Sequence, residues 1–195
     1  MISDHPGKPL ALEALTDVRT LEGPRVRLVP LGPEHFEVVW AGLADEENMR
    51  LTGTQAEFTE EAVAAHLARI GAAPDRADWA ILDASTDQYL GEIVLNELDE
   101  DNASMNTRIA LAPGLPGRGY GTEAMTVVLD HAFAEIGLHR VGLDVFSFNP
   151  RALRSYEKAG FVVEGRQRDT LFWDGEWTDS ILMGVLSSDP RATFR

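Results

Sequence analysis

A strand pattern, a glycine-rich turn and a long helix pattern follow one another directly between residues 104 and 136. Residues 104–112 are predicted to form a strand, which ends at residues 113–117, a segment with two prolines and two glycines. A helix is then expected over 119–136, followed by Gly137 as a C-cap. Its buried stripe is formed by Met125, Val128, Leu129, Ala132, Phe133 and Ile136. This junction brings the end of a strand to the N-terminus of a packed helix.

The rest of the chain predicts an α/β protein of the α+β type. Further helices are expected at 34–43, 59–70 and 149–159, and further strands at 26–29, 79–83, 89–97, 140–146, 161–172 and 176–186. This order favours a mixed, mostly antiparallel central sheet of about six to seven strands, flanked by helices on both faces. We expect one domain over residues 21–188, with an N-terminal arm at 1–20 and a C-terminal tail at 189–195.

Composition excludes several classes of site and partner. The chain has no cysteine, which rules out disulfides, cysteine-bound zinc and a cysteine nucleophile, and fits a cytoplasmic location. The first residues lack a signal-peptide pattern, and no apolar run approaches the roughly 18 residues of a membrane helix, so no membrane association is expected. The formal net charge of -15 disfavours nucleic acid and favours a cationic partner, although acidity can also serve solubility alone.

The glycine turn has the features of an anion site. Glycines allow backbone conformations that direct successive N–H groups into one concavity, and the following helix N-terminus adds partial positive charge. A dinucleotide-binding turn would follow the first strand of a parallel unit, and a Walker loop needs Gly-Lys-Ser/Thr, so neither matches. A glycine turn without a ligand remains possible on these residues alone.

A second motif begins at Asn149, which follows a strand and opens a helix. Asn149 and Tyr156 lie about two helical turns apart, so the amide and the phenol share a face of the helix. Both groups can then contact different parts of one extended ligand. Taken singly, Asn149 is also a good N-cap and Tyr156 a typical core aromatic residue.

Three segments carry a resemblance to a known family. They are Gly-Arg-Gly-Tyr-Gly-Thr-Glu-Ala at 117–124, Asn-Pro-Arg-Ala at 149–152 and Tyr-Glu-Lys-Ala-Gly-Phe at 156–161. Together they resemble the GNAT superfamily of N-acetyltransferases, and within it the ribosomal-protein N-terminal acetyltransferases and the spermidine/spermine acetyltransferases. The resemblance runs over about 26–186 and implies acetyl-coenzyme A as co-substrate, with no metal. It defines the donor better than the acceptor.

The resemblance also implies roles for individual residues. Backbone groups of Ala110, Leu111 and Ala112 would pair with the pantetheine arm, Asn149 would bond to it, and Tyr156 would lie near the thioester sulfur as the candidate acid. The pyrophosphate would be held by Gly117, Arg118, Gly119, Tyr120, Gly121 and Thr122. Relatives usually have glutamine or arginine at Pro116, and proline removes one N–H donor there.

The general base is less defined. Many relatives have a glutamate at the position of Asn106, and asparagine cannot accept the proton. Glu92 is the substitute that we select and Glu97 is the alternative; strand alternation would place them on opposite faces. A water relay is a third possibility. The histidines lack metal-ligand spacing and are expected to be structural.

Three functions follow for the chain as a whole. The first is direct acetyl transfer, in a ternary complex, to a primary amine that is either a protein N-terminus or a small molecule. The second is acetylation of a polyamine such as spermidine or spermine, favoured by the acidic balance and the tail at 172–179. The third is a non-catalytic acyl-coenzyme A-binding regulatory module. The tryptophans of the predicted hairpin at 173–177 would line the acceptor cleft or a homodimer or higher homo-oligomer interface.

Overall fold

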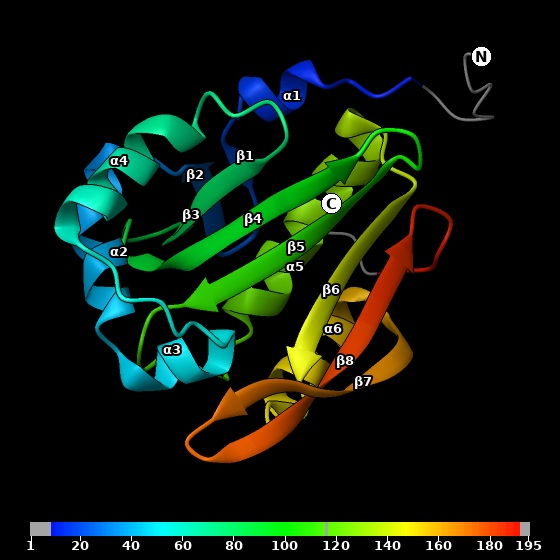
Figure 1. Ribbon diagram of the computed structural model, residues 1–195. Coiled ribbons are helices and arrows are strands. Elements are labelled where there is room, and N and C mark those ends of the chain that lie inside the picture. The colour runs from blue at the N-terminus through cyan, green and yellow to red at the C-terminus, as the bar shows by residue number, and fades with distance from the viewer. Residues whose placement is uncertain (1–8, 116, 192–195) are drawn as a thin grey trace.

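The computed structural model describes residues 9–115 and 117–191, and its centre is one twisted sheet (Figure 1). The expectation about the missing N–H of Pro116 therefore lies outside the described residues. The strands of the sheet are β1 (Leu21–Glu22), β2 (Val26–Pro30), β3 (Ala77–Asp83), β4 (Tyr89–Asp99), β5 (Ser104–Leu111), β6 (Arg140–Phe146), β7 (Val162–Trp173) and β8 (Glu176–Leu186). They lie in the order β1-β2-β3-β4-β5-β6-β8-β7.

All neighbouring strands are antiparallel except β5 and β6, which are parallel and pair over only three residue pairs. The last of these pairs joins Asn106 to Gly142. A Cβ atom at Gly142 would lie 2.6 Å from the Asn106 side-chain oxygen, so glycine permits this close approach. Beyond it the pairing stops, and the sheet is open between the C-terminal halves of β5 and β6.

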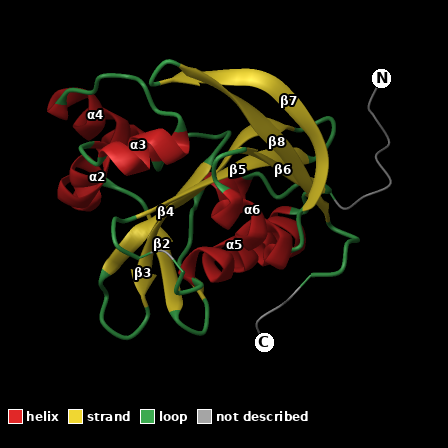
Figure 2. Cartoon of the chain, turned by 90° about the horizontal axis from the view of Figure 1, so that it is seen from below, coloured by secondary structure: helices red, strands yellow, loops and turns green. Residues whose placement is uncertain are grey.

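Helices cover both faces of the sheet, with α5 and α6 on one side and α2, α3 and α4 on the other (Figure 2). The helical segments are α1 (Glu13–Thr16), a 3-10 turn (Pro33–His35), α2 (Phe36–Leu43), α3 (Glu46–Thr52), α4 (Glu60–Ile70), α5 (Tyr120–His131), a π-helical turn (Ala132–Ile136) and α6 (Pro150–Ala159). Buried apolar residues of α5 pack on the sheet in the main core, and α4 packs its stripe on Leu31 and Ala80 in a second cluster. This burial supplies most of the driving force for the fold.

The predicted mixed, mostly antiparallel sheet is confirmed, with one more strand than the expected six to seven. The additional strand is β1, which has only two residues and therefore no readable alternation. Helix α3 was not expected, because none of its residues is buried and it has no apolar stripe. Its N-cap is Asp45, whose side chain accepts from the backbone N–H of Asn48 at 2.7 Å, and Gly53 ends it at φ +66°.

The described part of the expected N-terminal arm is packed on the domain. Leu15 of α1 is fully buried in the main core, and the backbone N–H of Ala11 donates to the carbonyl of Ile136 at 2.9 Å. Apolar residues spaced along 10–18 make this packing favourable, although their periodicity is weak. Within the part of the chain that the structure describes, no helix is long and apolar enough to cross a membrane.

Candidate active site

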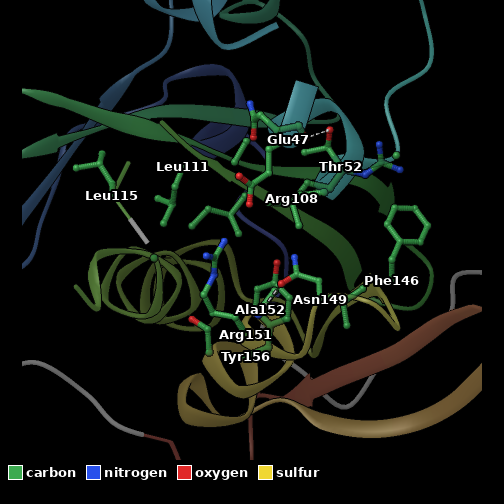
Figure 3. Close-up of a pocket in the computed structure, with 18 of the residues that line it drawn as sticks. Glu47, Thr52, Arg108, Leu111, Leu115, Phe146, Asn149, Arg151, Ala152 and Tyr156 are labelled. Atoms are coloured by element: carbon green, nitrogen blue, oxygen red, sulfur yellow. Dashed lines mark hydrogen bonds between the residues drawn. The ribbon is translucent and has the colours of Figure 1, made fainter. Parts of the chain in front are cut away.

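A cavity of about 700 Å³ opens where β5 and β6 diverge. It is lined by the ends of these strands, the glycine turn, the start of α5, one face of α6, most of α3 and part of β7. Figure 3 shows Glu47 on α3 across the cavity from Arg151 and Tyr156 on α6 and from Asn149, which directly precedes this helix. The cavity therefore joins segments that are far apart in the sequence.

The edge of β5 offers backbone groups to this opening. The N–H of Ala112 donates to the carbonyl of Leu90 on β4 at 2.8 Å, and the Ala110 carbonyl faces Gly91, where a Cβ atom would lie 2.2 Å from it. Because neighbouring residues of a strand direct their backbone groups to opposite sides, the groups of Leu111 face the opening. Of the three expected backbone contacts, the geometry thus favours Leu111, while Ala110 and Ala112 line the cavity.

The glycine turn lies at one end of the cavity. Gly117 and Gly119 have φ values of +87° and +84°, conformations that other residues rarely adopt, and both line the cavity together with Gly121 and Thr122. Gly119 is the N-cap of α5, and no side chain caps the helix there. Its first N–H groups are therefore available to an anion, which the positive end of the helix also attracts.

Two residues of the turn direct their side chains elsewhere. Tyr120 donates its hydroxyl to Asp83 at 3.0 Å, and neither Tyr120 nor Arg118 is among the residues that line the cavity. Arg118 is exposed, and its carbonyl accepts a hydrogen bond from Arg25. Positive charge at this end of the cavity comes instead from α6, through Arg151, Arg154 and Lys158.

The structure brings Asn149 and Tyr156 to the same cavity, as their spacing predicted. Asn149 caps α6 by accepting from the N–H of Ala152 at 3.0 Å, which leaves its amide N–H₂ free to face a ligand. Burial, aided by the negative charge of Asp144, raises the pKa of Tyr156 to about 12. Its phenol therefore stays protonated at neutral pH and can act as a donor.

The two candidate bases do not lie in the cavity lining. Glu92 is on the face covered by α2 and α4, where burial and the charge of Asp78 raise its pKa. Glu97 accepts a hydrogen bond from Asn106 and lies on the same side as Glu92, so the expectation of opposite faces is wrong. The reason is local: Glu97 has φ +56° and the register of β4 shifts after Asn96, which breaks the alternation.

Acidic residues also line the cavity, and of these Figure 3 shows Glu47 across from α6. The acidic residues in the lining are Asp45, Glu47 and Asp144, and Arg108 also belongs to it. Helix α3 and its N-cap supply Glu47 and Asp45, and sequence reasoning missed them because α3 itself was missed. The signals that could have revealed α3 are the Asp45 cap and the terminal Gly53. Among the described residues, no cluster of three or more His, Asp or Glu side chains is arranged to hold a metal ion.

Comparisons with known proteins agree with this arrangement. A family model described as an acetyltransferase (GNAT) domain matches residues 25–162. Spermidine N(1)-acetyltransferase from Vibrio cholerae is 30% identical over 108 residues, which are 55% of this chain and 62% of that protein. A Bacillus subtilis protein named as a candidate ribosomal N-acetyltransferase is 29% identical over 99 residues, 51% of this chain and 54% of that protein. The aligned part thus spans less than two thirds of these relatives.

The fold has a counterpart among solved structures. A crystal structure of spermidine N-acetyltransferase from Vibrio cholerae, in complex with CoA and spermine, matches with a TM-score of 0.79 at 22% identity. The match covers 84% of this chain and 96% of that one, so it supports the architecture over almost the whole domain. Because the family model spans most of the sequence and includes strands β2 to β6, the glycine turn and α6, this chain belongs to the GNAT family of acetyltransferases.

Proposed function

We propose that the protein transfers the acetyl group of acetyl-coenzyme A directly to a primary amine. The observation that carries this proposal is the divergence of β5 and β6, which joins an anion-binding turn at one end of the cavity to an acidic region at the other. A polyanionic donor and a cationic acceptor can then meet at the opening between the strands. The absence of cysteine favours a ternary complex over an acyl-enzyme.

The donor end fits coenzyme A by charge and by backbone geometry. Pyrophosphate would bind the uncapped N–H groups that begin at Gly119, and Arg151, Arg154 and Lys158 would add positive charge. The pantetheine arm would lie along the edge of β5 and bond to the backbone of Leu111 and the side-chain amide of Asn149. This order of contacts brings the thioester toward Tyr156.

The chemistry requires a neutral amine, because an alkylamine with a pKa near 10 is mostly protonated at neutral pH. Water in the acidic half of the cavity would accept that proton, since neither Glu92 nor Glu97 lines it. The amine would attack the thioester carbonyl, with the N–H of Leu111 donating to the oxyanion. Tyr156 would donate to the sulfur as the thiolate leaves, a role suited to a phenol that keeps its proton.

Three acidic residues support a cationic acceptor. Asp45, Glu47 and Asp144 line the acceptor side against a single Arg108, so the field there attracts ammonium groups. A protein N-terminus or a small amine satisfies this requirement, and a polyamine satisfies it with more than one charge. The polyamine alternative is favoured because the acidic groups come from two different elements, α3 and β6.

The decisive experiment is a thiol-release assay with acetyl-coenzyme A. The acceptors would be spermidine, aminoglycosides, amino acids and short peptides with free N-termini. Turnover with one class and not the others identifies the acceptor. Tight coenzyme A binding without turnover on any amine would refute the enzymatic proposal and leave the acyl-coenzyme A-binding module.

Glu47 provides a sharper test of the polyamine alternative. Glu47→Gln should raise the KM for spermidine about fivefold, the effect of about 1 kcal/mol for one exposed ion pair, without changing the KM for acetyl-coenzyme A. Glu46→Gln is the matched control, because Glu46 is the preceding residue of α3, is exposed and does not line the cavity. Equal effects of the two substitutions would show that Glu47 does not contact the acceptor.

The β7–β8 hairpin supports a second proposal, that two copies of the chain associate. Phe172 and Trp177 pack against each other with ring centroids 5.0 Å apart, yet Trp177 remains 61% exposed. Phe172 is on β7, the edge strand of the sheet, where backbone groups are open to another chain, and Trp177 is its partner on β8. Trp177→Ser should convert the associated form to a monomer in sedimentation velocity; an unchanged sedimentation coefficient with a higher acceptor KM would instead favour a role in the acceptor cleft.

A further inference from the structure

Arg25 connects the start of β2 to the glycine turn. It lies directly before Val26, almost a hundred residues from the turn in sequence, and its Nη1 donates to the carbonyl oxygen of Arg118 at 3.0 Å. Arg25 is not among the residues that line the cavity. Any influence of Arg25 on the donor is therefore expected to act through the turn.

The hydrogen bond to Arg118 sets the orientation of one peptide plane. In a trans peptide the carbonyl of one residue and the N–H of the next point in opposite directions. None of the described peptide bonds is cis. With the Arg118 carbonyl held toward Arg25, the N–H of Gly119 points away from Arg25. Gly119 lines the cavity with a φ of +84°, and because glycine has no Cβ its backbone can adopt other conformations unless a contact holds it.

Arg25 is itself held from two sides. Its Nε donates to the carboxylate of Glu123 at 2.8 Å, and Glu123 is almost fully buried in the first turn of α5. On the other side the guanidinium lies 5.3 Å from the centre of the Tyr120 ring, and the Tyr120 hydroxyl is fixed by Asp83. These contacts restrict the guanidinium to the place where it meets the Arg118 carbonyl.

The same arrangement controls charge near the anion site. An unpaired carboxylate in the first turn of α5 would repel a pyrophosphate at that helix end. The positive charge of Arg25 neutralises Glu123 at close range, so the helix N-terminus keeps its attraction for an anion. Arg25 thus contributes both orientation and charge balance without entering the cavity.

We propose that Arg25 is a positioning residue for the donor, which orients the Arg118–Gly119 peptide so that the Gly119 N–H faces the pyrophosphate. This inference rests on the acetyl-coenzyme A part of the proposed function but not on the identity of the acceptor. In this proposal Glu123 and Tyr120 hold the guanidinium of Arg25 in place, and Arg25 orients the peptide. It also explains why Tyr120 turns its side chain away from the cavity.

The test compares two binding probes that differ in the pyrophosphate. Coenzyme A binding would be measured by calorimetry, and pantetheine, which has no pyrophosphate, by competition against a bound fluorescent coenzyme A analogue. Arg25→Gln should weaken coenzyme A binding about tenfold and change pantetheine binding less than twofold, because only the phosphate contacts are disturbed. Arg27→Gln is the matched control: Arg27 is on β2, pairs with Asp87 and is outside the cavity.

Arg25→Lys is the second variant. Lysine keeps the positive charge and the backbone bonds to Glu123. It lacks the planar guanidinium that reaches both Glu123 and the Arg118 carbonyl, so the substitution should still weaken coenzyme A binding at least threefold. It also keeps the test open if Arg25→Gln does not fold. Wild-type affinity in Arg25→Lys, or an equal loss for coenzyme A and pantetheine in either variant, overturns the proposal. Failure of every amine in the turnover assay would refute the proposed reaction and leave this binding result intact.

Discussion

Replacing Glu123 by glutamine should destabilise the protein by about 2 kcal/mol. Oε1 of Glu123 accepts from the backbone N–H groups of Arg25 at 2.6 Å and Val26 at 3.1 Å, and Oε2 accepts from Arg25 Nε at 2.8 Å. Glutamine can keep the two backbone bonds through its oxygen but turns an N–H₂ toward Nε–H. The loss is one hydrogen bond between charged groups, about 1.5–3 kcal/mol, and the half-exposed guanidinium of Arg25 can recover contact with water.

Alanine at the same position should cost more, about 3–5 kcal/mol, because it also removes the acceptor of two backbone N–H groups. Val26 is fully buried, so its N–H cannot bond to water instead. For a chain of this size 1 kcal/mol shifts Tm by roughly 2–4 °C. Glutamine should therefore lower Tm by roughly 4–8 °C and alanine by roughly 6–20 °C.

Thermal unfolding and urea denaturation, both followed by circular dichroism, measure these differences. Glu135→Gln is the control, since it breaks an exposed ion pair with Arg19 and should cost less than about 1 kcal/mol. A Glu123→Gln variant as stable as the wild type would show that the ion pair contributes nothing. Equal losses for glutamine and alanine would show that the backbone bonds to Glu123 have no net value.

Three other changes test separate parts of the structure. Gly91→Ala should prevent folding or lower Tm by more than about 10 °C, because its Cβ would lie 2.2 Å from the Ala110 carbonyl oxygen. Gly114→Ala is the control: a Cβ there would meet open space, so the free energy of unfolding should fall by only about 1 kcal/mol. Soluble expression and melting curves distinguish the two variants. Burial lowers the pKa of His131 from 6.5 to about 4. Between these pH values the unfolded chain binds a proton at His131 and the folded chain does not, so the free energy of unfolding should fall by about 3 kcal/mol as the pH drops through this window. In urea titrations at several pH values, the free energy of unfolding of His131→Leu should depend less on pH than that of the wild type. An equal pH dependence in the two proteins would show that His131 is not the group responsible. Tyr156→Phe should lower kcat about a hundredfold and leave the Kd for coenzyme A within twofold; a weaker Kd with unchanged kcat would refute the donor role of the phenol.

The parts of the fold that sequence could predict are those with strong local signals. Gly137 ends the long helix in the left-handed conformation, Asn149 caps α6, and both boundaries agree with expectation. The π-helical turn at Ala132–Ile136 continues the same apolar stripe, so it did not disturb the prediction of a helix over 119–136. The junction of strand, turn and helix was predictable for the same reason.

Of the elements that line the candidate site, the glycine turn and α6 could be predicted from the sequence and α3 could not. Glycines and an N-cap residue report backbone conformation directly, whereas α3 is short, has no fully buried residue and leaves no periodic pattern. Glu97 was misplaced because one residue with positive φ reverses the alternation on which the prediction rested. Contacts between distant segments, such as that of Arg25 with Glu123, leave no trace in a single sequence.

The short pairing of β5 with β6 has a consequence for how the folded chain responds to its ligand. Three residue pairs join the two parts of the sheet, so the amides of β5 and β6 that face the opening beyond Asn106 and Gly142 have no ladder partner on that side. A donor lying between the strands would supply the missing partners from both directions. Ligand binding should then act as a last step of sheet formation, and hydrogen exchange at Leu111 should slow far more than exchange in the continuous ladder of β3 with β4.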